Sequence, residues 1–389
     1  MSDTRVDVIV LGAGPAGAAA AVTAARAGLS VALIDKARFP RDKLCGGLFS
    51  GRSLLVYQAV FDSRSTPLDM LCCTDVTFFQ GRADLGEVSG APPIYLTMRR
   101  DLDTVLMSQA VRAGARDLTG ERVAEVDVTA PAVRLHSGLR VTGRALIGAD
   151  GVNSQVARAL FGASYDRRKI GFAMEIEAPV PSGDPHRPIR IDFGAAAWGY
   201  GWSFPKKAST TIGIGGPQRL TPDFKAALHD YLSHLGEAGQ GIKARGHHIP
   251  CGDFPVTPGR GATLLAGDAA GLVDPVTGEG IAYAMQSGQA AAHSVAAALN
   301  AGDPTRALPL YRDRISDIHR DLRIARRIKP MIFAPWLQPS FARSFTRSRT
   351  LKHMYLQVLA GECDYPTLSR AVLRRLPRVA LSVLRPGRP

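Results

Sequence analysis

Three glycines near the start of the chain have the spacing of a phosphate-binding turn. Gly12, Gly14 and Gly17 lie in the run Gly-Ala-Gly-Pro-Ala-Gly, in which Ala16 precedes the last glycine. The first glycine permits a tight turn, the second lets the backbone approach a pyrophosphate, and the third lets a helix pack closely on a strand. The free N–H groups at the start of that helix favour phosphate. The spacing therefore predicts a dinucleotide-binding turn.

Such a turn needs a strand before it, a helix after it and a second strand that ends in an acid. Residues 6–11 are apolar and predict the first strand, and an alanine-rich stretch to residue 28 predicts the helix. Residues 30–34 predict the second strand, which is followed by Asp35 and Lys36. An acid about 20 residues after the glycines hydrogen-bonds a ribose hydroxyl in such folds. We therefore expect Asp35 and Lys36 to contact the cofactor.

Two later segments also read as buried strands that run into an acid. The first ends in Asp150 and Gly151, and the second ends in Gly267 and Asp268. The turn that follows the second strand supplies Pro275, Gly278, Gly280 and Ile281. Its Pro and Gly residues let the backbone approach a flat ring system. In an unrelated α/β protein these acids would be a helix cap and a turn residue, but three such segments in order favour a dinucleotide that carries a flat ring system.

In order and spacing, the three segments resemble the fingerprints of the p-hydroxybenzoate-hydroxylase-like FAD oxidoreductases over roughly residues 1–300. The resemblance implies an α/β fold with a Rossmann-like FAD-binding domain, an inserted antiparallel β-sheet substrate domain and a helical C-terminal region. It also implies that Arg100, at a helix start, reaches the cofactor. The expected FAD-binding domain comprises residues 1–65, 99–165 and 256–300. The expected substrate domain comprises 66–98 and 166–255, and the basic helical region comprises 301–389.

The composition is that of a folded enzyme-sized chain. Of 389 residues, 46% are hydrophobic and 21% are charged, which suffices for a full core in about two domains. No stretch approaches the roughly 18 unbroken apolar residues of a membrane span, and the apolar N-terminus lacks the leader of a signal peptide. Five irregularly spaced cysteines fit neither a disulfide framework nor a metal site, and they suit a reducing cytoplasm.

Most of the formal net charge of +14 belongs to the C-terminal region. Residues 320–389 carry 15 Lys and Arg against 3 acids, interleaved with bulky apolar side chains. Near the end, apolar residues between 368 and 383 recur at near-helical spacing beside Arg374, Arg375 and Arg378. Such segments favour the anionic inner face of a cell membrane, although a helical subdomain packed on the body explains them equally well. No nucleic-acid motif accompanies the charge, so no nucleic-acid partner is expected.

Two further segments indicate the class of substrate and the residues near the reaction centre. A glycine-rich loop follows the second strand and contains Cys45 and Gly46, close to where the flavin ring is expected. Tyr200, Trp202 and Phe204 alternate along a strand that ends at Pro205. On a strand these three aromatic side chains face one side, and such a wall suits a long apolar substrate. The simpler interpretations are an inert, packed cysteine and ordinary core aromatics.

Together, the Cys-Gly-Gly loop and the Tyr-x-Trp-x-Phe-Pro motif resemble the geranylgeranyl reductase family. The resemblance implies reduction of prenyl-chain double bonds in a lipid, quinone or pigment precursor. Hydride from reduced flavin and a proton would add across each bond, with Cys45 orienting the substrate or relaying the proton. The loop reads Gly-Gly-Leu-Phe-Ser, which departs from the family's Gly-Gly-Gly-Leu-Ser pattern. There is no second glycine fingerprint, so NADPH or ferredoxin is expected to act transiently as reductant.

Other functions remain open. Halogenases carry a Trp-x-Trp-x-Ile-Pro motif that is close to residues 200–205, but the chain lacks a convincing catalytic lysine before Arg99, since Lys43 is explained as the flank of the Cys loop. An FAD-dependent aromatic hydroxylase would use oxygen on the same flavin. From a different class, a flavin-bearing protein at a membrane surface would sense redox state or carry lipid without turnover.

Overall fold

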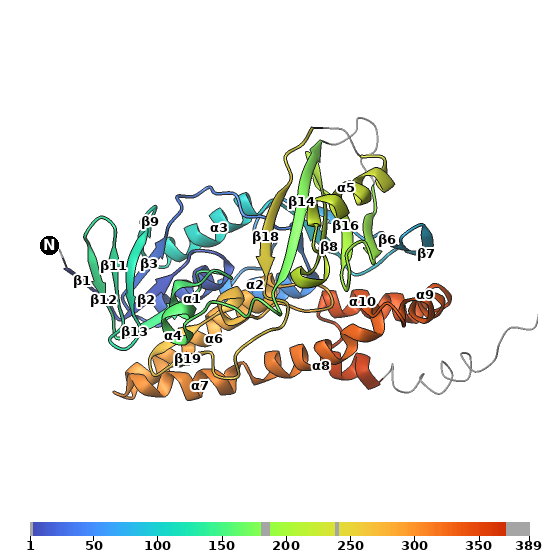
Figure 1. Ribbon diagram of the computed structural model, residues 1–389. Helices are drawn as coiled ribbons and strands as arrows, with labels where there is room; N and C mark the ends of the chain where they lie inside the picture. The colour runs from blue at the N-terminus through green and yellow to red at the C-terminus, as the bar shows by residue number, and fades with distance from the viewer. Residues whose placement is uncertain (1–2, 180–186, 238–240, 371–389) are drawn as a thin grey trace, which may run out of the picture.

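The computed structural model describes residues 3–179, 187–237 and 241–370, and its elements form two main sheets flanked by helices (Figure 1). The first is a six-stranded sheet with the order β19-β20-β13-β2-β3-β9. Its neighbours pair in parallel except β19 and β20. The strands are β2 (Val8–Leu11), β3 (Val31–Asp35), β9 (Arg116–Thr119), β13 (Ala145–Gly148), β19 (Gly259–Arg260) and β20 (Thr263–Leu265).

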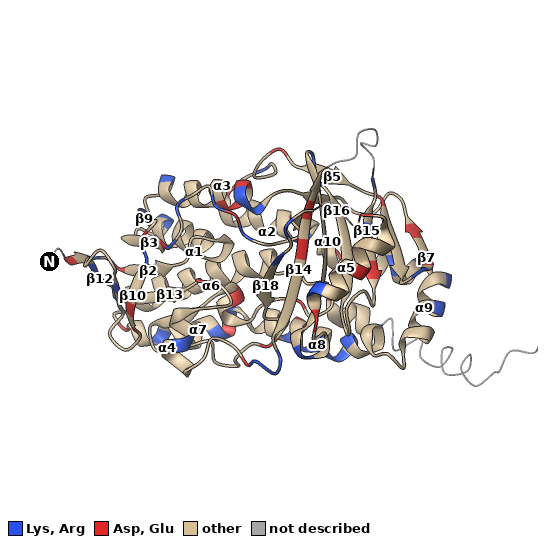
Figure 2. Cartoon of the chain, turned by 45° about the horizontal axis from the view of Figure 1, so that its top comes forward, with Lys and Arg blue, Asp and Glu red and all other residues tan. Residues whose placement is uncertain are grey.

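The centre of this sheet is nearly free of charge (Figure 2). In β2, β3, β13 and β20 the only charged residue is Asp35, at the end of its strand. Parallel sheets are covered on both faces, which explains these continuous apolar runs. The packing helices include α1 (Pro15–Arg26), α3 (Arg99–Arg112) and α6 (Ile281–Asn300). α1 and α6 touch closely because Gly288 lacks a side chain: a Cβ there would lie 2.1 Å from the Ala16 carbonyl oxygen.

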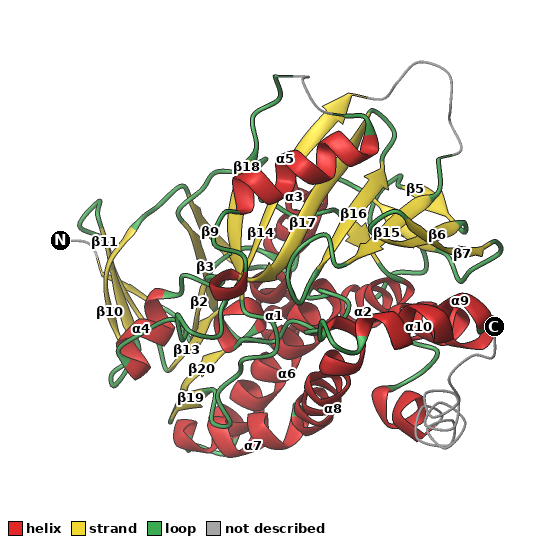
Figure 3. Ribbon diagram, turned by 45° about the vertical axis from the view of Figure 1, so that its right-hand side comes forward, coloured by secondary structure: helices red, strands yellow, loops and turns green. Residues whose placement is uncertain are grey.

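The second main sheet has seven strands in the order β18-β14-β17-β16-β15-β6-β7 (Figure 3). The strands are β6 (Val76–Gln80), β7 (Ala83–Val88), β14 (Gly171–Pro179), β15 (Ile189–Phe193), β16 (Tyr200–Pro205), β17 (Ser209–Pro217) and β18 (Arg245–Ile249). All neighbours are antiparallel except β15 and β6. The expectation of an antiparallel sheet is therefore corrected at this one pair, because β6 joins the sheet from a distant earlier segment.

The two faces of this sheet have different partners. α5 (Phe224–Leu235) packs on the even-numbered residues of β14, such as Met174 and Ile176. The opposite face carries Ala173, Trp202 and Phe204 and meets the C-terminal helices. Alternation of side chains along each strand separates these two layers.

Two small sheets and several short helices complete the body. One small sheet orders β1-β12-β11-β10 and the other β4-β8-β5. Their strands are β1 (Asp3–Arg5), β4 (Leu48–Phe49), β5 (Leu71–Cys73), β8 (Ile94–Leu96), β10 (Val123–Asp127), β11 (Ala132–Leu135) and β12 (Arg140–Thr142). The remaining short elements are α2 (Gly51–Phe61), α4 (Gln155–Phe161) and the 3-10 turns Gln218–Leu220, Gly267–Ala270 and Pro304–Arg306.

The C-terminal region is helical as far as it is described. It contains α7 (Ala307–Arg314), α8 (Ser316–Phe333), α9 (Gln338–Arg347) and α10 (Arg349–Ala360). The apolar and basic residues predicted to form a helix after position 370 lie outside the described residues. No helix within 3–179, 187–237 and 241–370 has the length and apolar character needed to cross a membrane. The α/β fold with a helical C-terminal region is confirmed, and the exact domain boundaries stay predictions.

Candidate functional site

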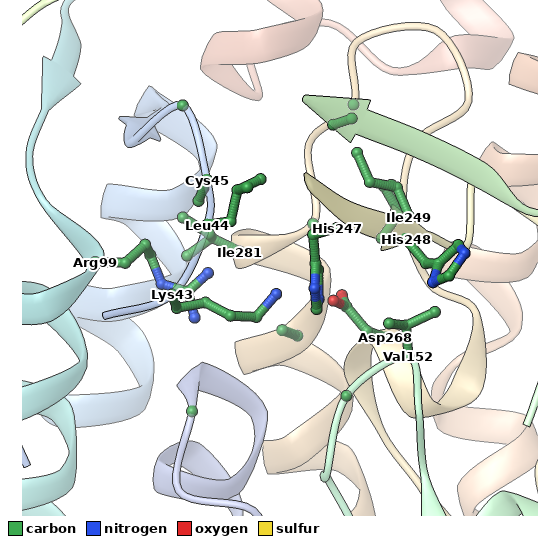
Figure 4. A pocket seen from close by; sticks show the side chains of 18 of the residues that line it. Lys43, Leu44, Cys45, Arg99, Val152, His247, His248, Ile249, Asp268 and Ile281 are labelled. Carbon is green, nitrogen blue, oxygen red and sulfur yellow. The ribbon is translucent and has the colours of Figure 1, made fainter. Parts of the chain in front are cut away.

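A cavity of about 550 Å³ is lined by the glycine turn, the Cys loop, the cavity-facing strands of the seven-stranded sheet and the turn 268–281. In Figure 4, Lys43 and Arg99 extend into it from one side, and Asp268 and His247 lie on the other. The cavity therefore joins residues from both main sheets.

The three glycines of the first motif have different structural roles. Gly12 has φ +103°, and a Cβ there would lie 2.2 Å from the Ala149 carbonyl oxygen. Gly14 lines the cavity as the N-cap of α1 with no side-chain cap, and a Cβ there would have no protein atom nearer than 3.6 Å. At Gly17 a Cβ would be 1.6 Å from the Gly12 carbonyl oxygen, so this glycine sets helix packing and does not line the cavity. The neighbouring Ala16 does line it.

The acids at the strand ends also reach the cavity. Asp35 accepts hydrogen bonds from the backbone N–H groups of Ala13 at 2.8 Å and Ala37 at 2.9 Å, and it lines the cavity together with Lys36. Asp150 accepts from the Ser154 hydroxyl at 2.5 Å, near the start of α4. Asp150 thus supports a helix start, as in the simpler interpretation, and it also lines the cavity. Gly151 lines it as well.

The arginine at the start of α3 that lines the cavity is Arg99 and not Arg100. Arg100 is exposed and does not line the cavity, so that prediction is wrong. Arg99 is buried, and its Nε and Nη2 donate to the two carboxylate oxygens of Asp103 at 2.7 and 2.8 Å. Arg41 joins the same carboxylate at 3.0 Å. Residues 99 and 103 share one helix face, whereas residue 100 is turned about 100° away.

The Cys loop is pressed against the aromatic wall. A Cβ at Gly46 would lie 2.9 Å from the Phe204 ring and 3.2 Å from Trp202 Nε1, so glycine is required for this approach. The Cys45 backbone N–H donates to Glu175 Oε1 at 2.9 Å, and the Gly47 N–H donates to Cys45 Sγ at 3.4 Å. Cys45 and Gly46 both line the cavity.

Tyr200, Trp202 and Phe204 form a continuous wall on the cavity side of β16. Successive ring centroids are 5.8 and 6.2 Å apart. The Tyr200 hydroxyl donates to the Thr277 carbonyl oxygen at 2.6 Å, which ties the wall to the turn 268–281. Pro205 was expected beside them but does not line the cavity, because it occupies the alternate, opposite side of the strand.

The last fingerprint turn contributes most of its predicted residues. Asp268, Pro275, Gly280 and Ile281 line the cavity, as does Gly278, where φ is +73° and a Cβ would lie 2.5 Å from the Tyr200 hydroxyl oxygen. Gly267 does not line it. A Cβ there would lie 3.0 and 3.2 Å from the Cβ atoms of Ala16 and Ala284, so this glycine packs between α1 and α6.

The sequence interpretation missed Glu175, His247 and Glu279, and it treated Lys43 only as the flank of the Cys loop, although all four line the cavity. Burial raises the pKa of Glu175 to about 7, lowers that of His247 to about 3 and lowers that of Lys43. Burial also raises the pKa of Glu279 to about 7. The available signal for Glu175 was the presence of two acids, Glu175 and Glu177, at alternate positions of the otherwise apolar strand β14.

Comparisons with known proteins agree with this geometry. The sequence profile of the FAD binding domain family matches residues 5–171. A menaquinone reductase from Mycolicibacterium smegmatis is 31% identical over 392 aligned residues that cover 92% of each chain. A geranylgeranyl diphosphate reductase from Rhodobacter capsulatus is 33% identical over 77% of each chain. This chain belongs to the geranylgeranyl reductase family.

A solved structure has a similar fold. A solved geranylgeranyl bacteriochlorophyll reductase-like protein from Thermoplasma acidophilum superposes with a TM-score of 0.76 over 92% of this chain and 96% of that one, at 23% identity. The protein is an FAD-dependent oxidoreductase. The residues fit that cofactor, since the uncapped start of α1 lies beside the Arg41 and Arg99 guanidinium groups. An alanine at Gly12 or Gly278 would collide with neighbouring atoms of the cavity wall, so glycine is needed at both positions.

Proposed function

We propose that this oxidoreductase saturates C=C bonds of a geranylgeranyl-type prenyl chain in a lipid, quinone or pigment precursor. The observation that supports this most is the wall of Tyr200, Trp202 and Phe204, which lines the cavity in contact with the Cys loop. A long apolar chain suits such a surface, and a small charged substrate does not. The named activity of the Rhodobacter capsulatus relative points to the same substrate class.

In this proposal, FAD in its reduced form supplies a hydride, and the protein binds, orients and protonates. The start of α1 with Arg41 and Arg99 binds the diphosphate of FAD, and Asp35 binds a ribose hydroxyl of FAD. The aromatic faces stabilise positive charge that develops on the more substituted alkene carbon. Cys45 orients the substrate or relays the proton. NADPH or ferredoxin is the proposed reductant.

The proposed location is the cytoplasm, with peripheral binding to the inner face of the cell membrane. Trp336 supports this, because it is 72% exposed in the segment between α8 and α9. Basic residues on these helices include Arg323, Arg326, Arg327 and Arg343. Aromatic and basic side chains together favour an anionic interface. Sedimentation with vesicles that contain anionic lipid, compared with neutral vesicles, tests this location.

The activity is tested anaerobically. The purified flavoprotein is reduced with dithionite and mixed with geranylgeranyl diphosphate, and the product is followed by mass spectrometry. Mass gains in steps of two hydrogens, with flavin reoxidised in proportion, are expected. If neither this nor other prenyl lipids react while aerobic turnover adds oxygen to a substrate, the reductase proposal is wrong and a hydroxylase is indicated.

The role of Cys45 is tested by Cys45→Ala. The backbone hydrogen bond from residue 45 to Glu175 is kept in this variant. We expect lower turnover with unchanged FAD content, measured by flavin absorbance against protein. Unchanged turnover would assign Cys45 to packing alone.

A further inference from the structure

Glu175 is an acid held in the wall of the cavity. Its side chain is 8% exposed, in the middle of β14, where Figure 2 shows acidic positions. Oε1 accepts from the Cys45 backbone N–H at 2.9 Å, and Oε2 is buried without a hydrogen-bond partner in the described part of the chain. A buried carboxyl oxygen without a partner is costly. The position of this unpartnered oxygen in a cavity wall points to a functional role.

The sheet fixes this carboxyl beside the aromatic wall. Glu175 and Trp202 both lie opposite Gly213, one on each side of β17. A Cβ at Gly213 would lie 2.5 Å from the Trp202 ring and 2.7 Å from Glu175 Cβ. The missing side chain therefore lets the indole ring lie against Glu175. The carboxyl sits where the aromatic wall meets the Cys loop.

Burial affects the pKa of Glu175 more than the charged groups around it do. Lys43 and Lys206 favour the carboxylate, and Glu177 opposes it. Lys206 is itself engaged, since its Nζ lies 3.4 Å from Glu177 Oε2. Arg245, opposite Glu175 on β18, is exposed and lies 3.5 Å from Asp42. Burial raises the pKa of Glu175 to about 7, so a large fraction of the carboxyl holds a proton at neutral pH.

We propose that Glu175 donates the proton that adds to the prenyl double bond. This assignment rests on the proposed reductase function. The alkene π electrons take the proton and form one C–H bond at the less substituted carbon. The other carbon accepts a hydride, that is, a hydrogen with its electron pair, and so forms the second C–H bond. Bound reduced FAD would supply this hydride. Glu175 is left as a carboxylate and regains a proton from water before the next bond is reduced.

The test uses Glu175→Gln, which keeps the shape but has no acidic proton. The matched control is Glu87→Gln, because Glu87 is exposed on β7 at the far edge of the same sheet. Each FAD-loaded protein is reduced anaerobically and given geranylgeranyl diphosphate in single-turnover experiments from pH 5.5 to 9. We expect E175Q to keep its FAD content and lose about 100-fold or more in rate. The wild type and E87Q should slow as the pH rises through about 7, while the residual E175Q rate stays flat.

A second measurement does not depend on turnover. Infrared difference spectra of the oxidised, FAD-loaded protein at pH 5.5 and 9 should show two protonated carboxyl C=O bands that titrate near pH 7, one from Glu175 and one from Glu279. One of the two bands should be missing in E175Q, and both should remain in E87Q. If the wild type turns over and E175Q has the same rate and pH profile as E87Q, the assignment of Glu175 as proton donor is refuted while the proposed function stands. If the wild type reduces no prenyl substrate, the proposed function fails and this assignment fails with it.

Discussion

The third glycine of the first motif offers the sharpest test of how the cofactor cradle is built. In Gly17→Ala the new Cβ would lie 1.6 Å from the Gly12 carbonyl oxygen. Carbon and oxygen atoms approach to about 3.3 Å at closest, so this contact must open by roughly 1.7 Å and α1 must shift. Residues 15–24 of this helix are buried on every side, and overpacking of this kind costs about 3 kcal/mol or more. We expect a loss of thermal midpoint of roughly 6 to 12 °C for an unfolding unit of about 150–250 residues.

Gly14→Ala is the matched control in the same turn. A Cβ at this position has the Arg41 guanidinium as its nearest protein neighbour, 3.6 Å away, which is an ordinary contact. The protein without cofactor should therefore lose less than about 1 kcal/mol, the usual scale of an N-cap change. The added methyl group instead occupies the approach of the cofactor phosphates. We expect FAD to bind at least about tenfold more weakly, or about 1.4 kcal/mol.

The assay is thermal unfolding of each variant with and without FAD, together with FAD titration followed by flavin fluorescence. G17A should be destabilised in both states, and G14A should be destabilised only relative to the FAD-loaded wild type. A G17A protein as stable as the wild type would show that helix packing does not depend on this glycine. Wild-type FAD affinity in G14A would place the phosphates elsewhere.

Three further outcomes are expected. Arg99→Gln should release FAD on dialysis, because Asp103 keeps only Arg41 of its two arginine partners and the phosphate loses a cation. Arg100→Gln should retain FAD, and equal retention by the two variants would contradict the assignment to Arg99. Tyr200→Phe should lower thermal stability by about 1 kcal/mol through the lost hydrogen bond to Thr277, and an unchanged melting curve would speak against that tie. For Glu279, the folded pKa of about 7 lies above the usual value of 4.5, so its stabilisation is full below pH 4.5 and lost as pH rises through 7. Chemical denaturation should show a loss of stability over this pH range that is smaller in Glu279→Gln than in the wild type by on the order of 3 kcal/mol, because Glu175 contributes equally to both. Parallel pH profiles would refute it.

Local features were readable from the sequence because their causes are local. The glycine turn, its flanking strand and helix, and Asp35 follow from spacing within about 25 residues. The common face of Tyr200 and Trp202 follows from the two-residue period of a strand. These patterns, with the resemblance they carry, indicated FAD and the family correctly.

Tertiary structure decided what depends on side-chain direction and on contacts between distant segments. Helix rotation buries Arg99 and exposes Arg100, and strand alternation turns Pro205 away from the cavity. Glu175 meets the Cys45 loop across 130 positions of sequence, and only the packed cavity removes the water that would keep its pKa low. The sequence by itself indicated the cofactor, while the fold determined which acid lines the cavity.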